Sequence, residues 1–414
     1  MKLLHAADLH IDSPMRGLVR YERAPVEQMR GATRAAVENL VDLALKEQVT
    51  AVLLAGDVYD GTWRDVNTGL FFTGQMARLQ EADIPVFMIS GNHDAENKMT
   101  MELPLPGNVH RFDSGSPGTE VREGLGLAVH GQSFARGAVP HNLAEGYPAA
   151  RSGLFNVGLL HTSLNGRPGH DRYAPCSVEQ LANHGYQYWA LGHVHHRAVE
   201  HSDGPYVVFP GNTQGRDAGE TGPKGCTLVT VEDLQVVGSP EHHDLDSSAR
   251  WHEVRVDMAD AEDLADACVR VEEQLTSQVV DRAQPGRANA VRVVAFGPSE
   301  AHTPLVRGRE EFTNAVRRIG QEHPSVWIEK VRVETTHLRE WVDPEQVADI
   351  VAGVRQEGDR LLADPEQVRG IVDATRIRTK LHADLRGLFT EDGWTGRMSG
   401  EAVELLTALL EEKR

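Results

Sequence analysis

The feature that most restricts the fold of this chain is a series of short apolar segments, each of which ends in Asp, Asn or His. The segments cover residues 2–7, 51–55, 85–89, 156–160 and 188–191. Apolar runs of this length are typical of strands that are buried on both faces of a parallel sheet. The stretches 26–46 and 67–82, which lie between the first three segments, have the spacing of helices. The chain is therefore predicted to adopt an α/β fold.

Polar side chains follow each of the five segments at the point where the strand is expected to end. They are Asp8 and His10, Asp57 and Asp60, Asn92, His93 and Asp94, His161, and His193 and His195. Residues i and i+2 of an extended segment point the same way, so Asp8 and His10 can reach one ion. Open α/β sheets bind ligands at the carboxyl ends of their strands. We therefore expect the five sets to converge on one site.

The donor types of this set favour a transition metal. Carboxylate, amide and imidazole groups without thiolate suit Mn²⁺, Fe²⁺ or Zn²⁺ better than Mg²⁺ or Ca²⁺. Two ions roughly 3.5–4 Å apart can bind both the attacking and the leaving oxygen of a displacement at phosphorus. Asp57 is predicted to bridge them, because it follows Gly56 and ends the most apolar segment. His93 can carry a proton near neutral pH, and Asp94 is predicted to orient its ring. The pattern indicates a two-metal phosphoesterase.

Each motif alone has an ordinary explanation. Asp8-x-His10 is a frequent accident, His193-x-His195 suits a surface strand end, and Gly56-Asp57-x-x-Asp60 suits a turn that caps a helix. Their occurrence together, in this order and with helix-sized spacers, favours the metal site. The histidines outside the motifs are interpreted as solvated or hydrogen-bonded at strand ends: His130, His196, His201, His242 and His243.

The composition of the 414 residues limits the class of protein. The length predicts two or three domains, and 40% apolar with 25% charged residues is typical of a soluble globular protein. We find no run of membrane-helix length and no signal peptide at the start, and three scattered cysteines fit the reducing cytoplasm. A net charge of −19 disfavours nucleic-acid binding unless metal ions or a basic partner offset it.

The pattern restarts after a polar stretch at residues 240–248. Strands at 253–256, 290–296 and 326–333 alternate with helices at 260–279 and 310–319, which predicts a small α/β unit. The remainder is predicted to be helical, because Asp-Pro-Glu-Gln-Val occurs at both 343–347 and 364–368 and suits a helix start each time. A third helix is expected from about Ser399. The predicted domains are 1–245, 246–338 and 339–414.

The motifs, in this order, resemble the calcineurin-like metallophosphoesterase superfamily. Within it, residues 190–195 and Pro210-Gly211-Asn212 are similar to SbcD-type DNA repair nucleases. Residues 59–61, 63–65 and 67–69 resemble the bacterial YhaO-type exonuclease branch. The resemblance covers roughly residues 1–240. It implies a metallophosphoesterase β-sandwich flanked by helices, a small α/β capping domain, and a helical C-terminal segment that docks on an ATPase.

The same resemblance implies roles for individual residues. One ion would be held by Asp8, His10, Asp57 and His195, and the other by Asp57, Asn92, His161 and His193. Mn²⁺ is the expected metal. His93 would be the catalytic histidine that binds no metal, and it would assist attack by a metal-bound hydroxide while Asp94 orients its ring.

The function implied is a DNA exo- or endonuclease of double-strand break repair or recombination. The implied partners are DNA, an SMC-like (SbcC-type) ATPase and a second copy of the chain, in the cytoplasm and away from membranes. Asp60 departs from the pattern, since some repair nucleases carry a second histidine there, and Gly61 replaces the Arg of protein phosphatases. Two alternatives remain: a phosphodiesterase for small substrates such as cyclic nucleotides, and a subunit whose helical tail serves interaction.

Overall fold

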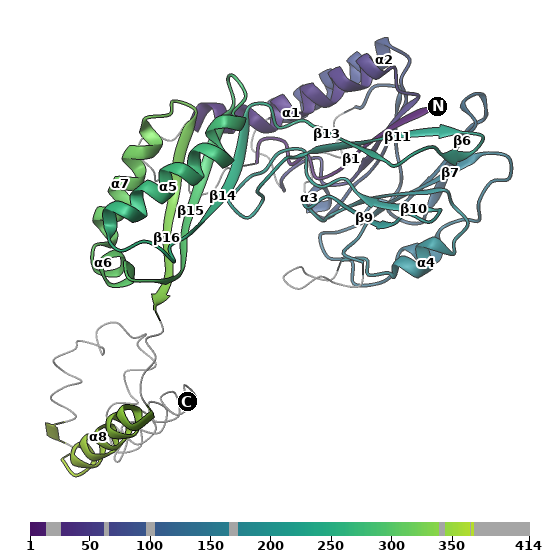
Figure 1. Ribbon diagram of the computed structural model, residues 1–414. Coiled ribbons are helices and arrows are strands. Elements are labelled where there is room, and N and C mark those ends of the chain that lie inside the picture. The colour runs from purple at the N-terminus through teal and green to yellow at the C-terminus, as the bar shows by residue number, and fades with distance from the viewer. Residues whose placement is uncertain are drawn as a thin grey trace. The chain divides into compact units, whose positions relative to one another are not determined.

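The computed structural model describes residues 1–13, 26–61, 66–96, 104–164, 173–338, 344–364 and 366–367 (Figure 1). The chain divides into two compact units, Met1–His337 and Leu338–Arg414. The first unit contains three sheets, and its two larger sheets position the polar strand ends. Each unit is described by itself.

The first sheet has seven strands, in the order β12-β11-β1-β2-β3-β4 with β13 paired to β11. They are β1 (Lys2–Ala6), β2 (Ala51–Ala55), β3 (Val86–Ile89), β4 (Val109–Arg111), β11 (Gly225–Glu232), β12 (Gln235–Val236) and β13 (Glu241–Asp244). The run β1-β2-β3-β4 is parallel, whereas β11 is antiparallel to β1. Helices α1 (Val26–Glu47) and α2 (Val66–Glu81) bury their apolar stripes on one face of this sheet, where Val41 and Phe72 are fully buried.

The second sheet has six strands, in the order β5-β6-β7-β8-β10-β9. They are β5 (Gly118–Arg122), β6 (Leu127–Gly131), β7 (Phe155–His161), β8 (Tyr188–Gly192), β9 (Ala198–His201) and β10 (Tyr206–Phe209). The central strands β6, β7, β8 and β10 are parallel. Trp189 and Phe209 on the outer face pack in a cluster that includes Leu181 of the short helix α4 (Val178–Ala182).

The two sheets pack face to face through a largely apolar layer. Leu53 and Phe87 of the first sheet share this layer with Leu159 and Tyr188 of the second, and all four side chains are fully buried. Burying such side chains contributes about 1.5–3 kcal/mol each to folding. The predicted β-sandwich flanked by helices is confirmed.

His5 is a polar residue within this layer. Its ring contacts the Tyr188 hydroxyl at 3.0 Å and the Leu191 carbonyl oxygen at 3.1 Å. Burial lowers the pKa of His5 from 6.5 to about 3, although the Leu191 contact raises it slightly. His5 is therefore neutral in the folded protein at neutral pH.

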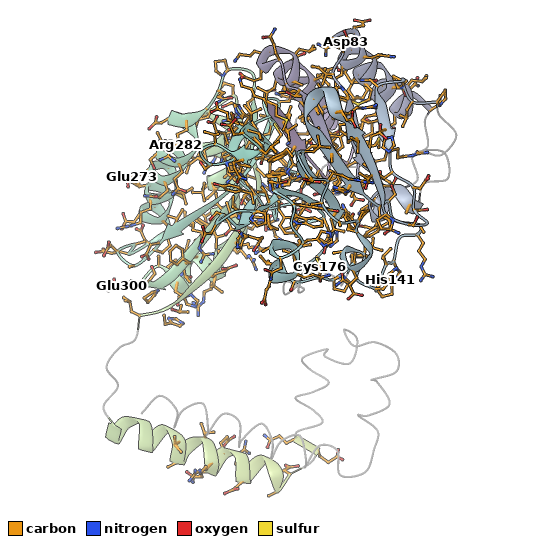
Figure 2. The ribbon with its side chains drawn as sticks, turned by 90° about the vertical axis from the view of Figure 1, so that its right-hand side faces the viewer. Asp83, His141, Cys176, Glu273, Arg282 and Glu300 are labelled. Carbon is orange, nitrogen blue, oxygen red and sulfur yellow. The ribbon has the colours of Figure 1, made fainter. Side chains whose placement is uncertain are left out.

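The third sheet is parallel, in the order β14-β15-β16. Its elements are β14 (Ala249–Asp257), α5 (Leu264–Gln278), β15 (Ala288–Ser299), α6 (His302–Arg307), α7 (Arg309–Gln321) and β16 (Val326–His337). The predicted alternation of strand and helix is present, with both expected helices packed on one apolar cluster around Val293 and Phe312. Figure 2 shows the side chains of this part as sticks, with Glu273, Arg282 and Glu300 labelled. The domain boundary at residue 245 stays a prediction.

The second unit contains α8 (Pro344–Leu362), which begins at the predicted proline. At the second Asp-Pro-Glu-Gln-Val copy, the Asp364 carboxylate accepts a hydrogen bond from the Gln367 backbone at 3.2 Å, as a helix N-cap does. The third predicted helix, near Ser399, lies outside the described residues. Within the ranges given above, no helix has the length and apolar character that a membrane crossing requires.

Candidate metal centre

The polar strand ends predicted from sequence converge where β1, β2 and β3 of one sheet meet β7 and β8 of the other. Four residues here adopt left-handed backbone angles that side chains other than glycine rarely take: φ is 53° at Asp8, 43° at His10, 52° at Asp57 and 99° at His193. Such strain is stored where a particular side-chain direction is required. These turns fold each strand end back into the site.

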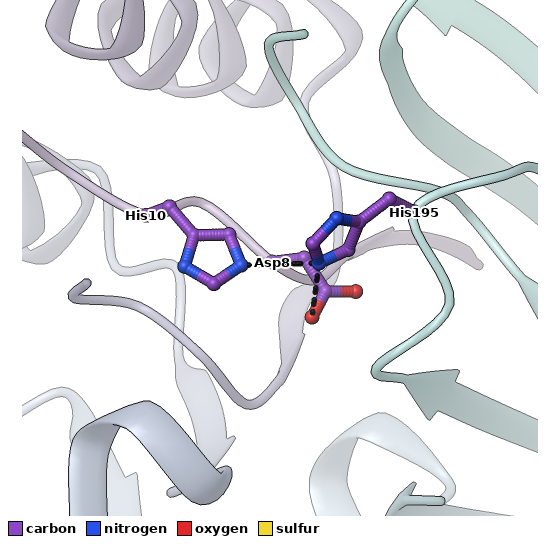
Figure 3. A group of neighbouring side chains, drawn as sticks. All are labelled: Asp8, His10 and His195. Atoms are coloured by element: carbon purple, nitrogen blue, oxygen red, sulfur yellow. Dashed lines mark hydrogen bonds and ion pairs between the residues drawn. The ribbon is translucent and has the colours of Figure 1, made fainter. Parts of the chain in front are cut away.

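Asp8, His10 and His195 form the first group of potential ligands (Figure 3). One ligand atom from each lies within 4.8 Å of the others, and the two histidine Nε2 atoms are 3.2 Å apart. The Nδ1 atom of His195 lies 2.6 Å from the Glu220 carboxylate, so it carries the proton and leaves Nε2 as a bare acceptor. A cation between the two Nε2 atoms and Asp8 fits this arrangement.

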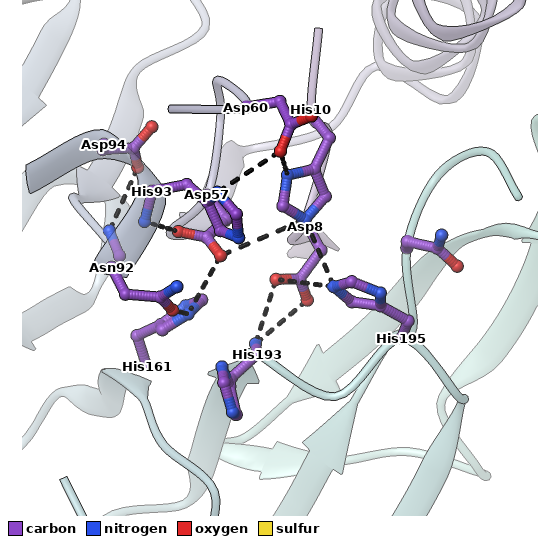
Figure 4. A network of polar contacts seen from close by, with 12 residues as sticks. Asp8, His10, Asp57, Asp60, Asn92, His93, Asp94, His161, His193 and His195 are labelled. Carbon is purple, nitrogen blue, oxygen red and sulfur yellow. Dashed lines mark hydrogen bonds and ion pairs between the residues drawn. The ribbon is translucent and has the colours of Figure 1, made fainter. Parts of the chain in front are cut away.

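Asp57, Asn92 and His161 form the second cluster (Figure 4). His161 Nδ1 donates to the Ala55 carbonyl oxygen at 2.8 Å, which leaves Nε2 facing the cluster. This Nε2 lies 3.1 Å from Asn92 Oδ1 and 3.4 Å from Asp57 Oδ2. Asn92 begins the short helix α3 (Asn92–Glu96). Three groups with lone pairs therefore point to one place, which again suits a cation.

Asp57 lies between the two clusters, as predicted for a bridging ligand. Its Oδ2 atom is 4.0 Å from His10 Nε2 and 3.4 Å from His161 Nε2, while Oδ1 accepts a hydrogen bond from the His93 backbone at 2.9 Å. Burial alone would raise the pKa of Asp57, but the surrounding imidazoles, His161 first, hold it well below its usual range. Asp57 is therefore ionised and can bind two cations.

The same buried, charged environment shifts the pKa values of His161, His10 and Asp8. Burial lowers the pKa of His161, but Asp57 outweighs it and raises that pKa to about 9. Burial lowers the pKa of His10 to about 4 and raises the pKa of Asp8. In the absence of metal the His161 ring therefore carries a second proton opposite the ionised Asp57. Metal binding at this position must release it.

His193 completes the predicted set. Its backbone N–H donates to both carboxylate oxygens of Asp8, at 3.1 and 3.0 Å, and its ring meets the edge of the His161 ring with centroids 5.3 Å apart. All seven predicted ligands thus lie in one network (Figure 4). They are Asp8, His10, Asp57, Asn92, His161, His193 and His195. Their individual roles in binding metal stay a prediction.

His93 lies beside this network, but Asp94 is not placed as expected. The Asp94 carboxylate accepts hydrogen bonds from the backbone N–H groups of Val58, Tyr59 and Gly91, at 3.2, 2.9 and 3.0 Å. The predicted contact of Asp94 with the His93 ring is therefore wrong, because these turns use both of its oxygens. Burial raises the pKa of Asp94 to about 6.

Asp60 is the carboxylate that faces the His93 ring. Its Oδ1 lies 3.3 Å from His93 Nδ1 and 3.5 Å from His10 Nδ1, and its Oδ2 accepts a hydrogen bond from Ser13 at 2.7 Å. His10, Asp60 and His93 also satisfy the spacing of a metal-binding group. The His93 side chain is 36% exposed, whereas His10 is 1% exposed. The His93 ring is thus far more exposed to solvent than the His10 ring.

The loop between β10 and β11 supplies two charged residues that the sequence reasoning missed. Glu220 accepts from His195 Nδ1 at 2.6 Å, from Asn212 Nδ2 at 2.7 Å, and from the Arg216 backbone and Nη2 atoms at 2.8 and 3.0 Å. Its pKa is well below its usual range, because these donors outweigh burial, which alone would raise it. Neither Glu220 nor Arg216 follows a strand directly, so no strand-end signal marks them. Their partner Asn212 does belong to a sequence motif, Pro210-Gly211-Asn212.

The third sheet holds this loop in place. Trp251 of β14 donates from Nε1 to the Gly215 carbonyl oxygen at 3.1 Å, and Gln214 donates to the Ala249 carbonyl oxygen at 2.8 Å. Trp251 also accepts from the Gly222 backbone at 3.0 Å. The position of Glu220 therefore depends on residues of β14.

Two glycines permit the close approach of the strand ends. A Cβ atom at Gly192 would collide with the Ala55 carbonyl oxygen and come within 2.8 Å of His161 Nδ1. A Cβ atom at Gly91 would collide with Asp57 Oδ1. A side chain at either position would displace a predicted ligand.

Comparisons with known proteins agree with this geometry. A family model described as calcineurin-like phosphoesterase matches residues 1–197, and one described as metallophosphoesterase YhaO, middle domain, matches residues 251–336. The chain is 32% identical over 406 residues to a protein named uncharacterized metallophosphoesterase YhaO from Bacillus subtilis. That match covers 92% of this chain and 97% of the relative.

More distant relatives carry the name DNA double-strand break repair protein Mre11. The protein from Thermoplasma acidophilum is 23% identical over 84% of this chain and 91% of its own length. The protein from Sulfurisphaera tokodaii is 24% identical over 50% of this chain and 52% of its own length.

Proposed function

Because this chain belongs to the calcineurin-like metallophosphoesterase superfamily, we propose that it is a two-metal phosphodiesterase that acts on DNA as an exo- or endonuclease. Membership of the family makes it a phosphoester hydrolase. The proposal adds the substrate and a role in double-strand break repair or recombination. It also assigns the metal, Mn²⁺, and the residues that hold it.

The observation that carries the proposal is the position of Asp57 between two clusters of ligand atoms. Asp8, His10 and His195 together with Asp57 would hold one ion. Asn92, His161 and His193 together with Asp57 would hold the other. Bound ions would polarise the phosphoryl oxygens and acidify water. The donor set, which mixes imidazole, carboxylate and amide without thiolate, supports Mn²⁺, Fe²⁺ or Zn²⁺.

In this proposal His93 is the catalytic residue that binds no metal. Its ring is more exposed than His10, and Asp60 meets its Nδ1 at 3.3 Å. Because Asp60 faces Nδ1, the other ring nitrogen, Nε2, is available to the scissile phosphate. His93 would donate a proton to the leaving oxygen or stabilise negative charge on the oxygens of the phosphorane.

The DNA substrate is supported by the names of the Mre11 relatives. The net charge of −19 favours a small substrate instead, since a cyclic nucleotide needs no long basic groove. The decisive experiment is a panel of linear duplex DNA, single-stranded DNA and cyclic nucleotides under matched Mn²⁺. Release of nucleotides from DNA is expected. Much faster turnover of cyclic nucleotides would establish the alternative, and no DNA cleavage with or without a cognate ATPase would falsify the nuclease proposal.

Two variants test the division of roles within the site. His93→Ala is expected to retain Mn²⁺ binding and lose turnover. Asp57→Asn is expected to lose both, because the bridging charge disappears. Equal loss of metal in the two variants would show that His93 is a ligand.

The partners proposed for this chain are DNA, an SMC-like (SbcC-type) ATPase and a second copy of the chain, all in the cytoplasm. The segment from residue 339, which is predicted to be helical and includes α8, is the proposed ATPase-docking region. Deletion of the residues after Asp343 should abolish co-purification with the ATPase and preserve phosphodiesterase activity. An intact complex after deletion would remove the docking role.

A further inference from the structure

We propose that Arg216 binds a phosphate oxygen of the substrate beside His93, a role that rests on the proposed phosphodiesterase function. The residue comes from the loop between β10 and β11, outside every motif of the strand ends. Its side chain is 18% exposed, so the guanidinium is largely buried but still reaches the solvent side of the site.

Glu220 fixes one edge of the guanidinium. Arg216 Nη2 donates to Glu220 Oε1 at 3.0 Å, Nε lies 3.5 Å from Oε2, and the Arg216 backbone N–H donates to Oε2 at 2.8 Å. Since Glu220 itself is held by His195 and Asn212, this edge cannot move independently of the loop. The side chain is therefore preorganised, which lowers the entropy cost of binding a ligand.

The other edge of the guanidinium faces the reaction site. Arg216 Nη1 lies 3.5 Å from Asp60 Oδ1, a distance too long for a strong hydrogen bond. The same Asp60 oxygen is 3.3 Å from His93 Nδ1. Arg216 and His93 thus meet one carboxylate atom from different elements. A phosphate in contact with His93 comes within reach of the two N–H groups of Nη1.

The negative charge around the site gives this guanidinium a second electrostatic role besides its ion pair with Glu220. Asp8, Asp57, Asp60 and Glu220 all lie in the network, and two bound ions would offset chiefly Asp8 and Asp57. An anionic substrate that approaches the Asp60 side therefore meets a carboxylate beside His93. Arg216 offsets that charge, and a planar guanidinium is suited to phosphate oxygens.

A purely structural role predicts a different result, so metal and phosphate affinities must be measured separately. The first readout is the affinity of chelator-treated protein for Mn²⁺, by calorimetry. The second is the affinity of the Mn²⁺-loaded protein for inorganic phosphate, which has no ester bond to hydrolyse. The third is KM and kcat for bis(p-nitrophenyl) phosphate, which reports phosphodiesterase activity independently of DNA.

Arg216→Gln is expected to weaken phosphate binding about 10–100-fold and to raise KM similarly, because a hydrogen bond to a charged group is lost. Both Mn²⁺ affinities should stay within about threefold of the wild type, because Glu220, the group that orients His195, keeps its contacts with His195 and Asn212. Arg216→Lys keeps the positive charge but loses the planar array of N–H donors, so it should recover part of the phosphate affinity. Arg78→Gln on α2 makes the same charge change in an exposed ion pair with Asp42 and should alter neither affinity.

Unchanged phosphate affinity and KM in Arg216→Gln would overturn the proposal. A parallel loss of Mn²⁺ affinity would also overturn it, since Arg216 would then act through Glu220 and His195. If the wild type fails to hydrolyse bis(p-nitrophenyl) phosphate, the phosphodiesterase function fails. The phosphate-binding comparison still decides the role of Arg216 in that case.

Discussion

Replacement of Glu220 by Gln should weaken one metal position and spare the other. Glu220 is 12% exposed and accepts hydrogen bonds from His195, Asn212 and Arg216. The substitution preserves shape but turns one acceptor oxygen into a donor. If the new amide faces His195, the imidazole proton must move to Nε2, the atom directed at Asp8 and His10. If it faces Asn212 instead, two donors oppose each other.

The expected magnitude follows from the contact that is lost. A hydrogen bond to a charged group contributes about 1.5–3 kcal/mol, which corresponds to about 10–150-fold in an equilibrium constant. Loss of the group that orients a metal-bound histidine typically costs about 10–100-fold in metal affinity. We therefore expect Mn²⁺ affinity at the position of His195 to fall about 10–100-fold. The Mn²⁺ affinity at the position of His161 and Asn92 should change by less than about threefold, because Glu220 does not contact either residue.

Calorimetric titration of chelator-treated protein with Mn²⁺ measures the affinity of both metal positions. Glu232→Gln, an exposed change at the end of β11, is the matched control for the loss of one charge. Thermal unfolding of the metal-free variant confirms that it is folded. Two unchanged Mn²⁺ affinities in Glu220→Gln would refute the assignment of His195 as a ligand held through Glu220.

Three further substitutions, with Gly31→Ala as a control for one of them, test the fold around the site. Because His5 has a pKa of about 3 when folded and 6.5 when unfolded, protonation of the unfolded chain should lower stability by about 1.4 kcal/mol from about pH 8 to about pH 5.5. His5→Gln should show a correspondingly shallower pH slope in urea denaturation, and parallel slopes would contradict this. Gly192→Ala should lower the free energy of unfolding by about 2–3 kcal/mol and weaken Mn²⁺ binding, since its Cβ collides with Ala55. Gly31→Ala in α1, where an added Cβ contacts no other atom of the described residues, should instead raise the free energy of unfolding by about 0.5–1 kcal/mol. Trp251→Phe removes the Nε1 donor to the Gly215 carbonyl oxygen and should lower the free energy of unfolding, measured in urea, by about 1–2 kcal/mol. An unchanged denaturation midpoint would show that this contact does not stabilise the fold.

The strand ends could be found from sequence because their signal is local. An apolar run followed by Asp or His specifies where a parallel strand stops, and parallel strands place those ends at one edge. Asp8, His10, Asp57, Asn92 and His161 were located in this way, and the structure brings them together. Helices α5 and α7 beside the third sheet are likewise predicted by their periodicity, with ends displaced by a few residues, whereas the short α6 is not.

The orienting groups could not be found, because their contacts join segments that are distant in the chain. Asp94 is close to His93 in sequence, and adjacency suggested that it holds the ring. The backbone N–H groups of Val58, Tyr59 and Gly91 need acceptors in the buried turns, so they take its oxygens instead. The sequence marks Asp60 only as a departure from the family pattern, whereas in the structure its carboxylate faces the His93 ring.

The chain's pattern alone establishes that five strand ends present oxygen and nitrogen donors of a metal-dependent phosphoesterase. That information lies in residue type and spacing, which fix where strands stop. The partners of these donors are decided by folding: Glu220 on His195, Asp60 on His93, and Arg216 between the two carboxylates. Hydrogen-bond direction depends on distances below about 3.5 Å between segments far apart in the chain, and no local periodicity encodes such distances.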